Sequence, residues 1–193
     1  MDDKVLVTYK NIDVGTLWWN ESKNIGEFAY FDSFIHSGIE LSPLLMPLSK
    51  KIYSFPDYDR ETYKGLPPLI SDSLPDKFGN ILMISYLNSL NVNINSISKL
   101  FHLNYIGKRG AGALEFEPTS SNFSLPSTIN INEIKQIIND IYSIKTNKFS
   151  YNENQQNHFN FLMNFGTSVG GARAKMFIGI DEINKIITSG DLP

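Results

Sequence analysis

The chain has 193 residues, of which 41% are apolar and 19% charged, and its formal net charge at pH 7 is −3. This length supports one sizeable domain or two small ones, and the mild acidity argues against a dedicated nucleic-acid surface, which needs clustered lysine and arginine. The sequence holds no cysteine, which excludes disulfides and thiolate metal sites. No apolar run approaches the roughly 20 residues of a membrane span, and the acidic N-terminus is unlike a signal peptide, so we expect a cytoplasmic protein without membrane contact.

The first sixty residues are predicted to be mainly β structure. Residues 4–10 alternate apolar and polar, as a half-buried strand does. Residues 14–19 and 25–35 are rich in aromatic and β-branched side chains and flank Asn20–Asn24, so they predict a hairpin. Two prolines interrupt residues 39–55, which we expect to form an edge strand or an extended loop.

Helical patterns begin after Gly65. A proline-fixed extended segment is predicted first, followed by a helix with Pro75 in its first turn and Asp76 at the positive end of its dipole. The buried face of that helix is expected to carry apolar residues at nearly fourfold spacing, namely Phe78, Ile81, Leu82, Tyr86 and Leu90. A second helix is expected at about 95–102, and a short strand at 113–117, stopped by Pro118.

The rest of the chain is predicted to alternate helices and strands beyond a polar linker at 120–128. An isoleucine stripe predicts a helix from about 131 to 144, and a second helix is predicted at 152–165. A strand at about 174–180, a turn at 181–184 and a last apolar stretch, "KIITS", follow. The whole chain therefore predicts an α+β fold.

The stretch "GTSVGGARAK", residues 166–175, is the candidate site whose residue types best suit ligand binding. Adjacent Gly170 and Gly171 allow backbone N–H groups to approach a phosphate, and Arg173 and Lys175 can neutralise its oxygens. The stretch is neither a Walker loop nor a Gly-x-Gly-x-x-Gly motif. From spacing alone, a phosphate-binding loop and an ordinary glycine-rich turn both remain open.

Three weaker features have ordinary structural interpretations. Lys108 and Arg109 lie beside three glycines, which fits a tight turn with solvated cations better than a second anion site. The three histidines are scattered without metal-ligand spacing. Trp18 and Trp19 are consecutive on a predicted strand and should point to opposite faces, so that one belongs to the core and the other can meet a partner.

Several separated motifs resemble the HipA family, bacterial serine/threonine kinases of toxin–antitoxin systems. The motifs are "VGTLWWN", "GEFAYFDSFI", "ELSPLLMPL", "GLPPLISDSLPDKFGN" and "GKRGAGALEFEP", which occur in the family's order, and "GTSVGGARAK", which resembles the family's glycine-rich nucleotide loop. The resemblance implies a β-rich N-terminal subdomain with helices at 1–118, followed at 119–193 by the beginning of a protein-kinase-like N-lobe.

The resemblance also implies ATP and Mg²⁺ as cofactors and a protein substrate such as an aminoacyl-tRNA synthetase. A HipB-like DNA-binding antitoxin would hold the kinase inactive. Carried over by position, Val169, Gly170, Gly171 and Ala172 would lie against the ATP phosphates, with Arg173 and Lys175 as further ligands. Ser168 matches the loop serine whose autophosphorylation switches the kinase off, because a phosphoserine would compete with ATP for the loop.

The same resemblance places the ATP-anchoring lysine, the catalytic aspartate and the metal-binding aspartate after the glycine-rich loop. The 18 residues that follow Lys175 contain no such set. We therefore expect a truncated kinase that is inactive by itself and needs its C-lobe or a separate kinase chain. One alternative is a stand-alone, antitoxin-like module that binds and regulates a HipA-type kinase, and another is a small-molecule phosphate binder built on residues 166–175.

Overall fold

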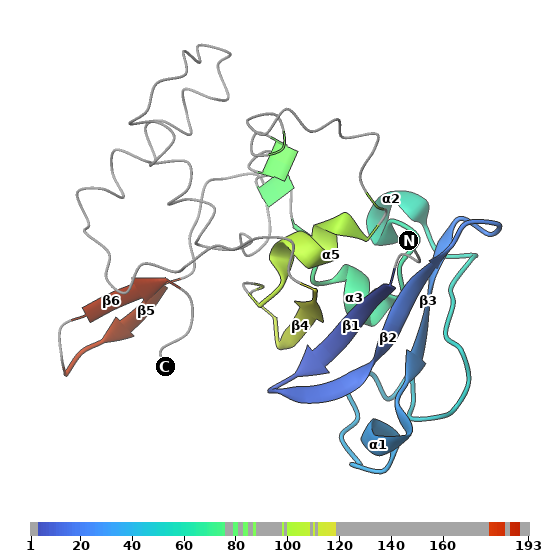
Figure 1. The fold of residues 1–193 in the computed structure, drawn as a ribbon, viewed down its shortest axis with the longest axis horizontal. Coiled ribbons are helices and arrows are strands. Elements are labelled where there is room, and N and C mark those ends of the chain that lie inside the picture. Colours follow the sequence, from blue (N-terminus) through green and yellow to red (C-terminus); the bar gives the residue numbers. More distant parts are fainter. Residues whose placement is uncertain are drawn as a thin grey trace. The chain divides into compact units, whose positions relative to one another are not determined.

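The chain divides into two compact units, one made of Met1–Leu74 and Ile97–Ser121, the other of Pro75–Ser96 and Asn122–Pro193. The predicted boundary after residue 118 stays a prediction. A computed structural model (Figure 1) describes residues 4–75, 79–80, 83–84, 87, 98, 100–108, 110, 112–118, 178–183 and 186–189.

The first unit is built on a four-stranded antiparallel sheet. Its strands are β1 (Lys4–Tyr9), β2 (Ile12–Asn20), β3 (Ile25–Tyr30) and β4 (Leu114–Glu117), in the order β3-β2-β1-β4. The predicted first strand, the hairpin and the strand before Pro118 are therefore confirmed. The β1–β2 turn uses positive φ at both Lys10 and Asn11, as a type I′ hairpin turn requires.

The second arm of the hairpin is shorter than predicted. β3 ends at Tyr30, and residues 32–35 form the short helix α1 (Asp32–Ile35) in place of a continued strand. Two polar residues at 32 and 33 interrupt the alternation, and Asp32 favours the positive end of the helix dipole. The turn of helix also brings Phe34 into the core, where its ring stacks on Tyr30 at a centroid distance of 5.7 Å.

One face of the sheet carries the core. Val5 lies opposite Leu17, and Leu17 lies opposite Phe28, so that these three fully buried side chains form a row across the strands. A second row runs from Tyr30 through Gly15 and Val7 to Phe116. Burying such side chains contributes about 1.5–3 kcal/mol each, so these rows are a main source of the unit's stability.

Short helices complete this unit: α2 (Arg60–Tyr63), α3 (Pro68–Ser71) and α5 (Phe101–Ile106), the last of which packs against β4. The segment after Gly65 was predicted to be extended, which is wrong from Pro68 onward, because a proline at the first helical position has its φ already set for a helix. The predicted helix at about 95–102 is confirmed only at its end: Ser98 lies outside helical structure, and α5 begins at Phe101. It ends at Ile106, and Gly107, which follows, has a φ of +54°.

The predicted helix after Pro75 is present. Gly79, Asn80, Met83, Ile84 and Leu87 are helical, and Met83 and Leu87, four residues apart, are buried. The residues expected on its buried face (Phe78, Ile81, Leu82, Tyr86, Leu90) lie outside the described residues.

Both edges of the four-stranded sheet are covered by nearby backbone. On the outer side of β3, Gly26 N–H donates to Gly65 O (2.8 Å), and Phe28 exchanges two hydrogen bonds with Tyr53 (2.9 and 2.7 Å). On the outer side of β4, Phe116 N–H donates to Gly107 O at 3.1 Å. Because unpaired edges invite strand addition from other chains, these hydrogen bonds hinder strand addition at Gly26, Phe28 and Phe116.

In the second unit the structure describes a two-stranded antiparallel sheet, β5 (Ile178–Asp181) with β6 (Ile186–Ser189). It confirms the end of the strand predicted at 174–180, the turn and the last apolar stretch. The predicted linker and the helices at 131–144 and 152–165 lie outside the described residues, and a kinase-like N-lobe stays a prediction. No helix in the described ranges has the length and apolar character that crossing a membrane requires.

Gly15 should be the most sensitive glycine of the sheet. A Cβ at this position would lie 2.2 Å from Ala29 O and 2.7 Å from the Phe28 ring, whereas a Cβ at Gly112 would meet nothing within 4 Å. We expect Gly15→Ala to lower the free energy of unfolding by about 1–3 kcal/mol or more, measured by urea denaturation. Gly112→Ala is the matched control, and equal stability of the two variants would contradict this packing.

Candidate interaction surface

The residues predicted to bind phosphate lie outside the described part of the chain. These are Ser168 and the loop residues Val169, Gly170, Gly171, Ala172, Arg173 and Lys175. Their roles stay predictions. The described residues contain no group of three or more histidine, cysteine or acidic side chains that could hold a metal ion.

The first unit carries an exposed apolar turn, residues 42–46. Met46 N–H donates to Ser42 O at 2.9 Å and closes the turn over Pro43, Leu44 and Leu45. Leu44 is 92% exposed and Leu45 44%, whereas Met46 beside them is 1% exposed. Two adjacent exposed leucines make this turn a candidate contact surface.

Tyrosines from the sheet side fix the base of this turn. Tyr30 Oη donates to Met46 O at 2.9 Å in a buried hydrogen bond, and burial raises the pKa of Tyr30 to about 12. Tyr53 Oη donates to Pro47 O and lies 2.9 Å from Ser49 Oγ. These bonds hold the backbone after Leu45, which reduces the backbone entropy that the turn would lose on binding.

Sequence reasoning did not single out this turn. Residues 39–55 were expected to be an edge strand or an extended loop, and the structure shows a loop that meets β3 through the single bridge between Tyr53 and Phe28. The available signal was "PLLMPL", in which three consecutive apolar residues lie between two prolines without the alternation of a strand.

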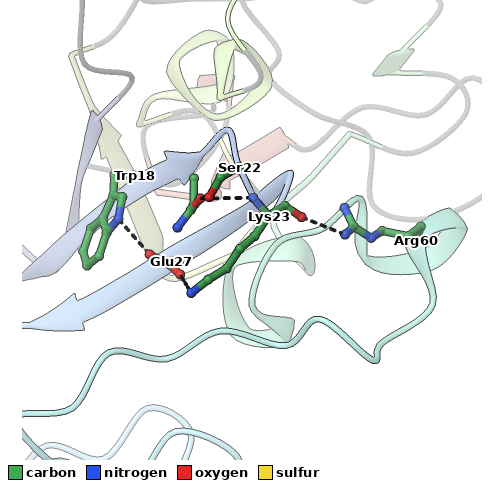
Figure 2. A network of polar contacts seen from close by, with 6 residues as sticks. Trp18, Ser22, Lys23, Glu27 and Arg60 are labelled. Atoms are coloured by element: carbon green, nitrogen blue, oxygen red, sulfur yellow. Dashed lines mark hydrogen bonds and ion pairs between the residues drawn. The ribbon is translucent and has the colours of Figure 1, made fainter.

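A polar network fixes the β2–β3 hairpin (Figure 2). Trp18 Nε1 donates to Glu27 Oε2 at 3.1 Å, and Lys23 Nζ pairs with Glu27 Oε1 at 2.7 Å. The hydrogen bond and positive charge of Lys23, with a further bond from Asn20, hold the pKa of Glu27 below its ordinary value, although burial opposes the shift. This carboxylate is fully engaged, so its role is structural rather than that of a general acid.

The tip of the same hairpin is tied to α2. Asn20 Oδ1 accepts hydrogen bonds from Lys23 N (3.1 Å) and Ser22 Oγ (2.7 Å), which shapes the turn. Arg60, the first residue of α2, donates from its guanidinium to the backbone oxygens of Lys23 (Figure 2) and Asn24. The network explains Trp18, while Trp19 has different surroundings: its ring lies against Gly65 and its Nε1 is buried without a hydrogen-bond partner in the described part of the chain.

Lys108 is engaged with carboxylates rather than free for an anion. Its Nζ lies 3.4 Å from Glu117 Oε1 and 3.7 Å from Glu115 Oε2, both on β4. This arrangement favours the ordinary-turn interpretation of the glycines around residue 110. Arg109, the other cation of that motif, lies outside the described residues.

The histidines with described positions have structural surroundings. His36 Nδ1 lies 2.6 Å from Asp32 O, one turn earlier in the chain. Burial, with a smaller contribution from the positive charge of Lys64, lowers the pKa of His102, which favours the neutral ring at physiological pH. His158 lies outside the described residues.

Comparison with known families shows which family the chain resembles. The family described as the HipA N-terminal domain matches residues 5–117, which is more than half of the chain. The matched range contains the four-stranded sheet, the apolar turn and helices α1, α2, α3 and α5. No curated protein matches the chain.

The Glu27 network generates a pH prediction. Because the pKa of Glu27 is lower in the folded than in the unfolded protein, its stabilisation is present above the unfolded pKa and is lost as pH falls through the folded pKa. We expect Glu27→Gln to cost up to about 1 kcal/mol at pH 7 and less at pH 3, measured by urea unfolding across that range. The exposed residue Glu21 provides the control variant Glu21→Gln, and an equal pH profile for the two variants would contradict the network.

Proposed function

Because the chain belongs to the HipA N-terminal domain family, we propose that it forms the N-terminal part of a HipA-like serine/threonine protein kinase of a toxin–antitoxin system. In this proposal residues 4–118 are the docking part, and residues 166–175 hold the phosphates of Mg·ATP. The observation that carries the proposal is the family match over residues 5–117, together with a glycine-rich stretch that follows it in the family's order.

The proposed ATP contacts use backbone and charge. Val169, Gly170, Gly171 and Ala172 would offer N–H groups to the phosphate oxygens, and Arg173 and Lys175 would supply positive charge. Mg²⁺ would bridge the phosphates and neutralise the charge that develops during transfer. A phosphate on Ser168 would place nearly two negative charges in the same loop and so exclude ATP, which makes Ser168 the proposed regulatory residue.

Phosphoryl transfer to a serine or threonine also needs a positioned base and a metal-binding carboxylate. In our proposal these groups come from a kinase C-lobe or a kinase chain and not from the 193 residues of this chain. The protein substrate, of which an aminoacyl-tRNA synthetase is the family example, and a HipB-like antitoxin are the proposed partners of the assembled kinase.

The apolar turn favours a second candidate, a regulatory module that binds a separate HipA-type kinase chain. Leu44 and Leu45 are exposed on a backbone that Tyr30 and Tyr53 hold in place. An apolar side chain that enters a pocket on a partner contributes binding energy through the surface that it removes from water. The two candidate functions therefore differ in which protein carries the pocket that the apolar turn would enter.

The ATP role is tested by calorimetric titration of the chain with Mg·ATP. We expect weak, saturable binding that Gly171→Asp abolishes, because a carboxylate at that position would repel the phosphates and occupy their space. Gly112→Asp introduces the same side chain at a glycine with open space and should leave binding unchanged. Absence of binding by the unmodified chain, or equal loss in the two variants, would contradict an ATP loop at 166–175.

The module role is tested with Leu44→Ser and a purified HipA-type kinase core that lacks an N-terminal domain of its own. Because Leu44 is largely exposed, the substitution should change unfolding stability by no more than about 0.5 kcal/mol. Affinity for the kinase core, measured by calorimetry, should fall at least about tenfold if Leu44 fills a pocket. Ile183→Ser is the matched control, since Ile183 is 91% exposed; equal affinities would exclude the turn as the contact.

A further inference from the structure

Three aromatic rings form a continuous row at the surface of the first unit. Phe55 and Tyr58 have ring centroids 4.9 Å apart with an interplanar angle of 57°, and Tyr58 and Tyr63 are 5.1 Å apart at 59°. All three side chains are only half-buried. Each ring therefore keeps part of its surface open to a ligand, and the tilted contacts fix the rings relative to one another.

The row is held at both ends. Phe55 follows two residues after Tyr53, whose backbone pairs with Phe28 on β3, and Tyr58 N–H donates to Phe55 O at 3.3 Å. Tyr63 closes α2, whose first turn is capped by Asp59, the acceptor of a 2.6 Å hydrogen bond from Thr62 N–H. The rings thus stand on a fixed backbone rather than on a free loop.

The charges beside the row are unbalanced. Asp57 lies between Phe55 and Tyr58 in the chain, and Glu61 between Tyr58 and Tyr63; both are exposed, and neither makes an ion pair or a side-chain hydrogen bond with any described residue. Of the two cations in this part of the chain, Arg60 is engaged, because it donates to the hairpin turn. Lys64 is exposed and directly follows Tyr63, and its positive charge acts on Asp59 and His102.

We propose that residues 55–63 form a docking surface for a basic segment of a protein partner, with lysine or arginine side chains over the aromatic row and paired with Asp57 and Glu61. Aromatic faces attract cations within about 6 Å of the ring centroid, and carboxylates beside them add charge complementarity. The same carboxylates would repel the phosphates of a nucleic acid. This surface is separate from the apolar turn, and its use does not depend on ATP binding or on the proposed kinase role.

The test uses the full chain labelled with ¹⁵N and an acetylated nona-arginine amide peptide as probe, followed by NMR. We expect chemical-shift changes concentrated at residues 55–63. Asp57→Asn combined with Glu61→Gln should weaken binding at least about tenfold, as expected when two charged contacts are removed. Tyr58→Leu, which keeps an apolar side chain but removes the ring, should also weaken it, and a thermal melt will establish that this variant folds.

A control variant distinguishes binding at residues 55–63 from a general effect of the net charge of the protein. Asp13→Asn combined with Glu40→Gln removes the same number of charges from two exposed residues. Asp13 lies near the β1–β2 turn, and the charge of Glu40 acts on Tyr30 at the end of β3, so both lie away from the hairpin tip to which α2 is tied. We expect this variant to bind nona-arginine as the unmodified chain does. Equal weakening in the two double variants, or stronger binding of a proline-rich peptide than of nona-arginine at the same residues, would overturn the proposal.

Discussion

The pair of backbone hydrogen bonds between Phe28 and Tyr53 is the constraint on which the surface of the first unit depends. Phe28 is fully buried at the end of the core row on β3, and Tyr53 is itself buried, so the bridge is shielded from water. It ties a long irregular segment to the edge of β3. The apolar turn lies before the bridge in the chain, and the aromatic row lies after it.

This arrangement lets one segment serve two purposes. By occupying the outer side of β3, Tyr53 and Gly65 prevent other strands from adding to the sheet. The same anchoring holds Leu44 and the rings of residues 55–63 on backbone that cannot collapse onto the core. The exposed apolar and aromatic groups can then bind a partner only through their own side chains, because strand addition at β3, the least specific form of association, is blocked.

The sequence predicts the strands of this unit well because alternation is a local signal. Residues 4–9 and the two arms of the hairpin carry it, and they pair as expected. Helices α1 and α3 were missed because each is only four residues long and depends on a buried contact, such as Phe34 on Tyr30, that no short window reveals. The exposure of Leu44 could not be predicted from the sequence either. It follows from two hydrogen bonds to the backbone, one from Tyr30 to Met46 O, 16 residues away, and one from Tyr53 to Pro47 O, 6 residues away.

The network around Glu27 could be predicted from the sequence only in part. The residue types were visible, and the cross-strand register that places Trp18 opposite Glu27 follows once the length of the hairpin turn is known. The interpretation of the tryptophans left open which of them would meet a partner. The register shows that Trp18 has an internal partner, the carboxylate of Glu27, so hairpin geometry supplied what residue type alone could not.

Charge pairing within the first unit bears on where an anionic cofactor would bind. Lys23, Lys50 and Lys108 each face a carboxylate, and Arg60 donates to backbone oxygens. A nucleotide phosphate would have to compete with a carboxylate at Lys23, Lys50 or Lys108, and with backbone oxygens at Arg60. In the function that we propose, phosphate recognition therefore rests on the glycines and cations of residues 166–175, and the first unit contributes contacts with proteins. The two kinds of recognition then use different parts of the chain, and a change in one need not disturb the chemistry of the other.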